Sequence, residues 1–157
     1  VFIVPLFLTA CFGGEDKDVV GVEEIQYGLP PKEIIYDEHG KEVWFALNAI
    51  TGLEGTPANG VTQSQLFEDG RYLHTIQLNI NPAEDGYFYE GWLSDGSDTI
   101  STGHLSNHFG DARHQLRFEA DEDLTGHMNV IVTLERDDGN PAPAEHVAEG
   151  VLKIRER

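Results

Sequence analysis

Three of the seven histidines lie close together in the sequence and could bind a metal ion. His104 and His108 are separated by three residues, His114 follows shortly after, and Asp111 lies between the last two. Neutral imidazoles that converge with a carboxylate suit zinc or copper. The surrounding glycine and asparagine residues indicate a loop, in which sequence spacing fixes no geometry. Solvated or locally hydrogen-bonded histidines are therefore the alternative interpretation.

Acidic turns form a second possible ligand set, in this case for calcium. Segments rich in Asp at residues 95–98, 121–123 and 137–138 offer the carboxylate oxygens that Ca²⁺ prefers. None of these segments follows the EF-hand loop pattern with its terminal Glu. The alternative is an acidic surface that keeps the domain soluble and has no specific ion site.

Motifs for catalysis are missing from the chain. No serine lies in a nucleophile-elbow pattern, and no Gly-Lys-Ser or Gly-Lys-Thr phosphate loop occurs. Glu90 and Glu135 could form the carboxylate pair of a glycosidase, but nothing in the sequence places them across a cleft. We therefore expect no enzymatic activity and no catalytic cofactor.

Composition restricts the partners and the class of fold. The 157 residues include 28 Asp or Glu and 10 Lys or Arg, so the formal net charge is −18. Because nucleic-acid binders neutralise phosphates with clustered Lys and Arg, we expect no nucleic-acid partner. The length and the 39% hydrophobic content predict one folded domain. The single cysteine, Cys11, excludes an intrachain disulfide.

The first residues have the pattern of an export signal. Residues 1–10 form an apolar run that is too short to span a membrane, and acidic, glycine-containing sequence follows. Leu8-Thr9-Ala10-Cys11 resembles the lipobox of bacterial lipoproteins. In that family the peptide before the cysteine is removed and the cysteine carries the lipid. No Lys or Arg precedes Cys11, so we expect the positively charged n-region of the signal to lie upstream of Val1.

The lipobox resemblance implies an extracytoplasmic protein held at the membrane by a covalent lipid on Cys11. Residues 11–40 are acidic and contain Pro30-Pro31, which predicts an extended linker. Short edge strands at residues 22–27 and 33–36 are an open alternative within this linker. The folded domain is expected at residues 41–157.

Within this domain the hydrophobic pattern has a period of two. Tyr72, Ile76 and Leu78 share one face of a strand, and Thr75 and Gln77 share the other. Further β-rich runs, separated by Gly-, Asn- and Asp-rich turns, occupy residues 42–50, 60–67, 86–94, 99–105, 115–120, 127–135 and 147–154. The pattern predicts an all-β fold, an antiparallel immunoglobulin-like β-sandwich of about seven to nine strands.

Aromatic side chains lie on both faces of the strand expected at residues 86–94. Phe88 and Trp92 share one face, whereas Tyr87 and Tyr89 share the other. The simplest interpretation is a central strand with the core on one side. Alternatively, an exposed Tyr87 and Tyr89 form a platform that stacks on a sugar or a peptide. Gly91 in mid-strand predicts a β-bulge or the close approach of another backbone.

Two segments carry a resemblance to a known family. The first segment is GYFYEGWL at residues 86–93, followed by STGHL at 101–105. It resembles the Tyr-x-x-Trp-Leu and Gly-x-Phe/Leu core of the anti-sigma-K factor C-terminal domain family. VIVTLERDDGNPAP at 130–143 is similar to that family's Val-Thr-Leu-Glu-Pro-x-Gly-Gly-x-x-x-Pro ending, and the match covers residues 44–154. The resemblance implies an extracytoplasmic β-sandwich that senses or binds a partner. Anti-sigma activity is not implied, because the membrane helix and the sigma-binding domain of those proteins have no counterpart here.

These observations together predict tethered recognition without catalysis. A lipid on Cys11 confines the domain to the membrane surface, where it binds an envelope protein or a glycan. The contacts are expected from Tyr87, Tyr89 and Trp92, or from the loops at one end of the sandwich. The alternative functions are a metal-binding envelope lipoprotein that uses the three clustered histidines or the acidic turns, and a structural envelope protein.

Overall fold

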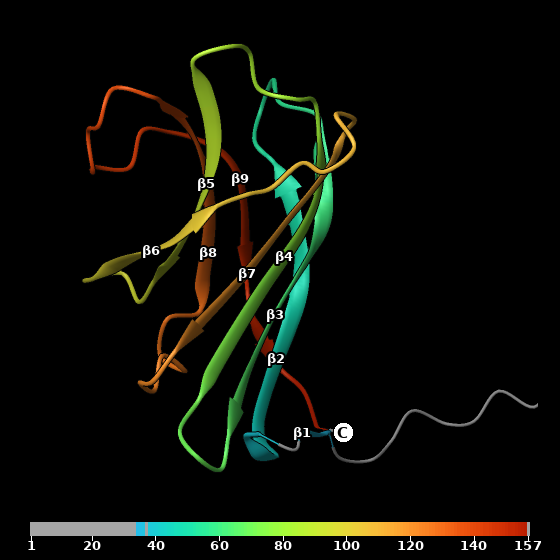
Figure 1. Ribbon diagram of the computed structural model, residues 1–157, viewed down its shortest axis with the longest axis vertical. Helices are drawn as coiled ribbons and strands as arrows, with labels where there is room; N and C mark the ends of the chain where they lie inside the picture. The colour runs from blue at the N-terminus through green and yellow to red at the C-terminus, as the bar shows by residue number, and fades with distance from the viewer. Residues whose placement is uncertain (1–33, 37, 157) are drawn as a thin grey trace, which may run out of the picture. The chain divides into compact units, whose positions relative to one another are not determined.

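The computed structural model describes residues 34–36 and 38–156, which form strands joined by turns and loops (Figure 1). The strands are β1 (Ile35–Tyr36), β2 (Gly40–Gly52), β3 (Ala58–Phe67), β4 (Tyr72–Ile80), β5 (Tyr87–Ser94), β6 (Thr99–His104), β7 (Arg113–Ala120), β8 (Asn129–Arg136), β9 (Glu145–Val151) and β10 (Lys153–Ile154). These residues contain no helix, and hence none long and apolar enough to cross a membrane. Every strand pair is antiparallel. The predicted antiparallel all-β fold is confirmed.

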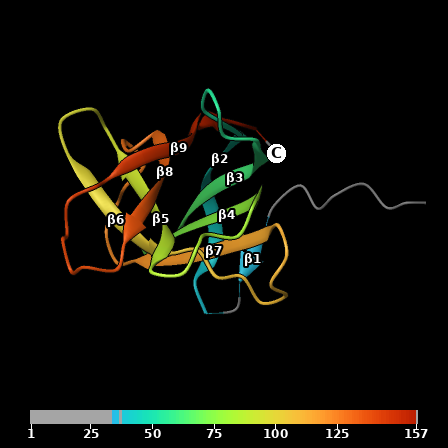
Figure 2. The ribbon, with the colours of Figure 1, turned by 90° about the horizontal axis from the view of Figure 1, so that it is seen from above.

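The strands form two layers that are continuous with each other. The order is β6-β5-β8-β9-β2-β3-β4-β7, with β1 and β10 paired to β2. One layer, β2-β3-β4-β7, joins the other, β6-β5-β8-β9, through a short β2–β9 pairing in which Thr51 lies opposite Glu149. At the opposite margin, a single bridge between Ser106 and Gln115 connects the two ends of the sheet. The sandwich is therefore a single curled sheet that nearly closes into a barrel (Figure 2).

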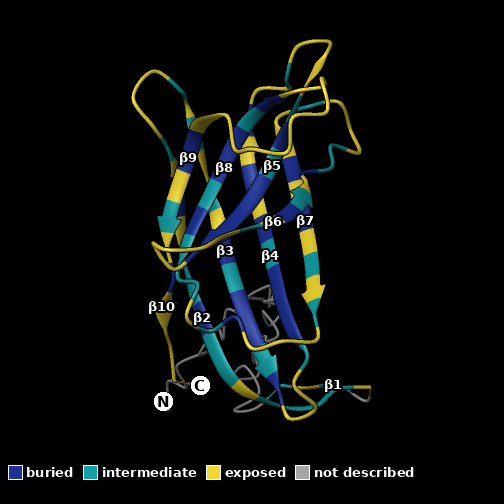
Figure 3. Ribbon diagram, turned by 90° about the vertical axis from the view of Figure 1, so that its left-hand side faces the viewer, coloured by how far each residue is buried: buried dark blue, intermediate teal, exposed yellow. Residues whose placement is uncertain are grey.

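The core lies between the layers and follows the predicted alternation. Ile76 and Leu78 of β4 are buried, and Gln77 between them is exposed (Figure 3). From the facing layer, Leu93 and Val132 pack in the same cluster and are fully buried. Complete burial of each such side chain stabilises the fold by about 1.5–3 kcal/mol, so this alternation provides much of the driving force.

The core also contains polar side chains. Ser64 and His74 are completely buried, and Ser64 Oγ is hydrogen-bonded to His74 Nδ1 at 2.8 Å. Burial lowers the pKa of His74 to about 4, because the charged imidazolium loses its hydration. Burial likewise raises the pKa of the neighbouring Tyr72 to about 12. Both side chains are therefore neutral at physiological pH.

Gly91 lies opposite an irregularity in the neighbouring strand. Gly91 and Trp92 of β5 pair with Gly103 and Ser101 of β6, so the extra residue, Thr102, belongs to β6, whereas β5 pairs with β8 without interruption. The bulge predicted at Gly91 is thus in β6 and not in β5. A methyl group at Gly91 would lie 2.7 Å from Thr102 Oγ1 and 3.0 Å from Leu116 Cδ1. Close side chains from β6 and β7 therefore leave little room for a side chain larger than that of glycine at this position.

A short strand, β1, lies ahead of residue 41, within the edge strand at residues 33–36 that the sequence leaves as an alternative. Ile35 of β1 pairs with Lys41 of β2, and the Tyr36 ring contacts the Phe67 ring edge-on with centroids 5.0 Å apart. Residues at the end of the expected linker thus contact the domain, through the pairing of β1 with β2 and through the Tyr36 ring. Cys11, the apolar run at 1–10 and the rest of the linker up to residue 33 lie outside the described residues.

Candidate functional site

The three clustered histidines occupy different environments. His104 is exposed and its ring lies against Phe88, with centroids 3.9 Å apart. His108 is exposed in the β6–β7 loop, where its Nε2 lies 3.3 Å from Ser106 Oγ. His114 is buried on β7. Across residues 34–36 and 38–156, no three His, Cys, Asp or Glu side chains gather in a way that could hold a metal ion. The predicted zinc or copper site is thus not assembled from these histidines.

The acidic turn at residues 95–98 uses its carboxylate internally. Asp95 Oδ1 accepts hydrogen bonds from the backbone N–H groups of Ser97 and Asp98, at 2.8 and 2.7 Å. These bonds, above all the one from Asp98, lower the pKa of Asp95 to about 2. The Asp95 carboxylate thus organises the β5–β6 hairpin and, within the described residues, belongs to no potential metal-binding group.

The aromatic platform expected on β5 is not formed. Tyr89 is 7% exposed and its hydroxyl donates a hydrogen bond to the Asn81 carbonyl at 2.9 Å. Trp92 is 5% exposed and its Nε1 donates to Thr133 Oγ1 at 2.8 Å. Tyr87 is exposed and lies beneath the guanidinium of Arg136. The alternative of an exposed Tyr87–Tyr89 platform is wrong, because the face of β5 that carries Tyr89 faces the core.

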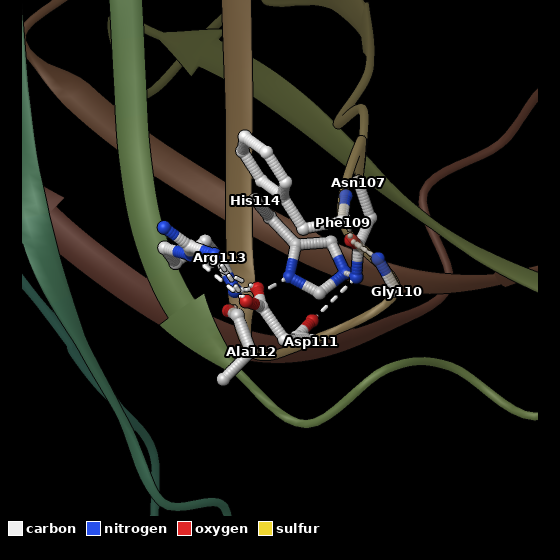
Figure 4. Close-up of polar contacts among 7 residues, drawn as sticks. All are labelled: Asn107, Phe109, Gly110, Asp111, Ala112, Arg113 and His114. Atoms are coloured by element: carbon white, nitrogen blue, oxygen red, sulfur yellow. Dashed lines mark hydrogen bonds and ion pairs between the residues drawn. The ribbon is translucent and has the colours of Figure 1, made fainter.

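A different site is built around the loop between β6 and β7, which Asn107 holds in shape (Figure 4). Asn107 Oδ1 accepts from the backbone N–H groups of Phe109 and Gly110, at 3.2 and 2.7 Å. Asn107 Nδ2 donates to the Asp111 carbonyl at 2.5 Å and lies 3.3 Å from His114 Nε2. One side chain therefore fixes the two ends of this short loop to each other.

His114, near the start of β7, holds the same loop against the sheet. Its Nδ1 lies 3.0 Å from the Ala112 carbonyl, which can only accept, so Nδ1 carries the hydrogen. Nε2 is then left as an acceptor for the Asn107 amide. The Tyr89 ring packs edge-on against the imidazole at 5.2 Å between centroids. Burial of Tyr89 and His114 thus supports the loop.

Phe109 projects from this loop into solvent. It is 69% exposed, and the Arg113 guanidinium lies over its ring, 4.3 Å from the centroid. Arg113 is held in turn by Asp111, with an ion pair of 2.5 Å between Nη2 and Oδ2. The hydrogen bond from Arg113 lowers the pKa of the Asp111 carboxyl. One face of the aromatic ring is therefore covered by a neutralised arginine and the other is open.

Below Phe109 the outward side of β3, β4 and β7 is hollowed. A cavity of about 390 Å³ is lined by side chains that include Val61, Gln77, Phe109, Arg113 and Gln115. A second hollow of about 370 Å³ shares Gln77, His108 and Gln115 with the first and extends along the strands to Gln63. The two together form a continuous open groove across three strands.

The strand registers arrange the floor of this groove in three rows. We call these nine positions the amide face; its rows are Asn59–Asn79–Arg113, Val61–Gln77–Gln115 and Gln63–Thr75–Arg117. Five of the nine residues are Asn or Gln and none is Asp or Glu. No Gln side chain of the amide face hydrogen-bonds to another described residue. Their donors and acceptors are free to bind a ligand.

Comparisons with known proteins add no identity. The chain matches no protein-family model, no curated protein and no solved structure. The resemblances to the anti-sigma-K C-terminal domain and to the lipobox therefore remain predictions from the residues alone.

Proposed function

We propose that this protein is a lipid-anchored, extracytoplasmic binding module without catalytic activity, which recognises an envelope component through the groove over the amide face. The observation that carries the proposal is the combination of a groove of about 390 Å³ with an exposed, braced aromatic ring at its rim. Ligand sites are typically concave and combine apolar side chains with a few polar groups that fix orientation. The groove has this composition.

The position of the groove supports a tethered function. Gly40, where β2 begins, and the C-terminal strand lie at one end of the domain, and the β6–β7 loop lies at the other (Figure 1). At that far end, three pairs of residues lie side by side across the sheet. They are Thr51 with Asn59, Asn59 with Asn79, and Asn79 with Arg113. At about 3.3 Å per residue, the 13 residues of β2 separate the two ends by roughly 40 Å. A domain tethered through its N-terminal side can thus present the groove away from the membrane.

Photocrosslinking in intact cells tests the site. A photoreactive phenylalanine analogue replaces Phe109 in one variant and Tyr87, an exposed aromatic outside the groove, in the matched control. We expect an envelope adduct from position 109 and none from position 87. Adducts from position 87 alone, or from neither position, would contradict the proposed site.

Fatty-acid labelling tests the anchor separately. Cells that express the protein with a clickable fatty acid should label the wild-type chain, and the Cys11→Ala variant should stay unlabelled in the soluble fraction. Label that survives the substitution would disprove acylation at Cys11, whatever the crosslinking experiment shows.

A further inference from the structure

We infer that the amide face binds an uncharged, hydroxyl-rich saccharide chain, with a sugar ring stacked on the open face of Phe109. This inference rests on the proposed function and names the class of ligand. It is carried by the unpartnered glutamines, the absence of carboxylates from the amide face and the geometry of Phe109.

The first argument concerns hydrogen-bond chemistry. A carboxamide has two donor hydrogens and an acceptor oxygen side by side. Neighbouring hydroxyls of a sugar also both donate and accept, so one amide can satisfy two of them at once. Gln77 and Gln115 lie opposite each other in adjacent strands and both are exposed. They thus present two such groups to one ligand.

The second argument concerns charge. The arginines of the amide face are already neutralised, Arg113 by Asp111 and Arg117 by Glu119 at 2.7 Å. With a net charge of −18, the chain repels anionic polymers. The amide face offers no carboxylate to a cationic peptide either. An uncharged ligand fits this surface best.

The third argument separates a saccharide from a protein partner. The centre of a protein interface is typically apolar and loses its water. Here the exposed apolar side chains at the groove floor and rim are Val61, 39% exposed, and Phe109. The rest of the amide face is polar, and a polar surface with one exposed ring suits a ligand that keeps many hydrogen bonds.

The size of the surface is also suitable. Three strands at about 4.8 Å spacing make the amide face roughly 10 Å wide, and alternate residues give rows roughly 7 Å apart. Two or three sugar units can lie on it. The chain would run along the groove from Phe109 towards Gln63, the direction in which the second hollow continues.

Affinity electrophoresis tests this inference with the full-length protein in a detergent that has no sugar headgroup. Native gels contain a neutral polysaccharide (a β-glucan, a mannan, a xylan or a galactan) or an anionic one (alginate or polygalacturonate). The acidic protein migrates rapidly in the gel, and binding to an immobile polysaccharide slows its migration. A neutral polysaccharide carries no charge of its own, so it does not affect migration by charge repulsion. We expect retardation by at least one neutral polysaccharide and by neither anionic one.

Three variants locate the binding. Phe109→Ala and the double variant Gln77→Ala/Gln115→Ala should each raise the Kd by about tenfold or more, the scale of one lost stacking or paired hydrogen-bond contact. Tyr87→Ala removes an exposed aromatic outside the groove and should leave the Kd unchanged. Far-ultraviolet circular dichroism and thermal melts establish that each variant is folded.

The outcomes distinguish this inference from the proposed function. If no neutral polysaccharide retards the protein but position 109 crosslinks to an envelope protein, the binding site stands and the saccharide assignment fails. Retardation that survives both groove variants places the sugar elsewhere and also overturns the assignment. If there is neither retardation nor a crosslink from position 109, both proposals fail.

Discussion

At the scale of single residues, His74 makes the domain sensitive to acid. Its pKa is about 4 in the folded protein, against a usual value of 6.5, because the ring is buried beside Ser64. The unfolded chain therefore binds the proton more tightly. Stability from the neutral ring is complete above pH 6.5 and is lost as the pH falls towards 4.

We predict that the free energy of unfolding decreases by about 3 kcal/mol over this interval, since each pKa unit corresponds to about 1.4 kcal/mol. Urea denaturation at a series of pH values between 7 and 4.5 measures it. In His74→Gln, which cannot titrate, the slope should be much smaller, whereas in His104→Ala, which alters an exposed ring, it should persist. Equal slopes in all three proteins would show that other groups cause the acid sensitivity.

Asn107 is the residue on which the shape of the β6–β7 loop depends. Asn107→Ala removes the acceptor for two backbone N–H groups, so we predict faster hydrogen exchange at Phe109 and Gly110 and weaker ligand binding. The control is Asn140→Ala. It removes a comparable hydrogen bond in another loop, in which Asn140 Oδ1 accepts from the backbone N–H of Ala142. Unchanged protection at Phe109 and Gly110 would mean that the loop is held by other contacts.

At the scale of the strands, the close packing around Gly91 of β5 limits the size of the side chain at this position. Gly91→Ala would place a methyl group against Thr102 Oγ1 and Leu116 Cδ1, so we predict a loss of about 1–3 kcal/mol of stability. Gly126→Ala is the matched control, because no atom lies within 4 Å of a methyl group there. Denaturant melts compare the two, and equal effects would argue against steric crowding at Gly91.

Strands could be predicted from the sequence because an apolar period of two is a local signal. The face that points inward was harder to assign where both faces carry aromatics. The period of two places Tyr87 and Tyr89 on one face of β5 but does not say whether this face is internal. Only the facing layer decides this, and the alternative with an exposed Tyr89 is wrong. The two-residue strand β1 is too short to give a secure pattern.

The candidate site was only partly visible in the sequence. Thr75, Gln77 and Asn79 stand out as the polar side of β4, and the short β3–β4 turn indicates their neighbours on β3. The pairing of β4 with β7 joins segments about forty residues apart, and no local signal specifies it. Rows such as Gln77–Gln115 therefore appear only once the tertiary pairing is known.

At the scale of the whole molecule, the charge of −18 opposes compaction. We predict that the melting temperature at pH 7 rises by several degrees between about 10 and 150 mM NaCl, as the Debye length falls from roughly 30 to 8 Å. Scanning calorimetry measures this dependence. Near pH 4.5, the isoelectric point, the same salt series should have little effect. A melting temperature independent of salt at pH 7 would contradict long-range repulsion.

The placement of the groove at the far end of β2 has a mechanical consequence. A force between a held ligand and the N-terminal side enters at the Gly40 end of β2 and leaves near Arg113 on β7. Its direction is nearly parallel to β2, β3, β4 and β7, so the hydrogen bonds between these strands are sheared together. Peeling an edge strand would instead break them one by one at lower force. Under the proposed tethered function, the domain would therefore resist drag on a bound ligand by shearing these hydrogen bonds together.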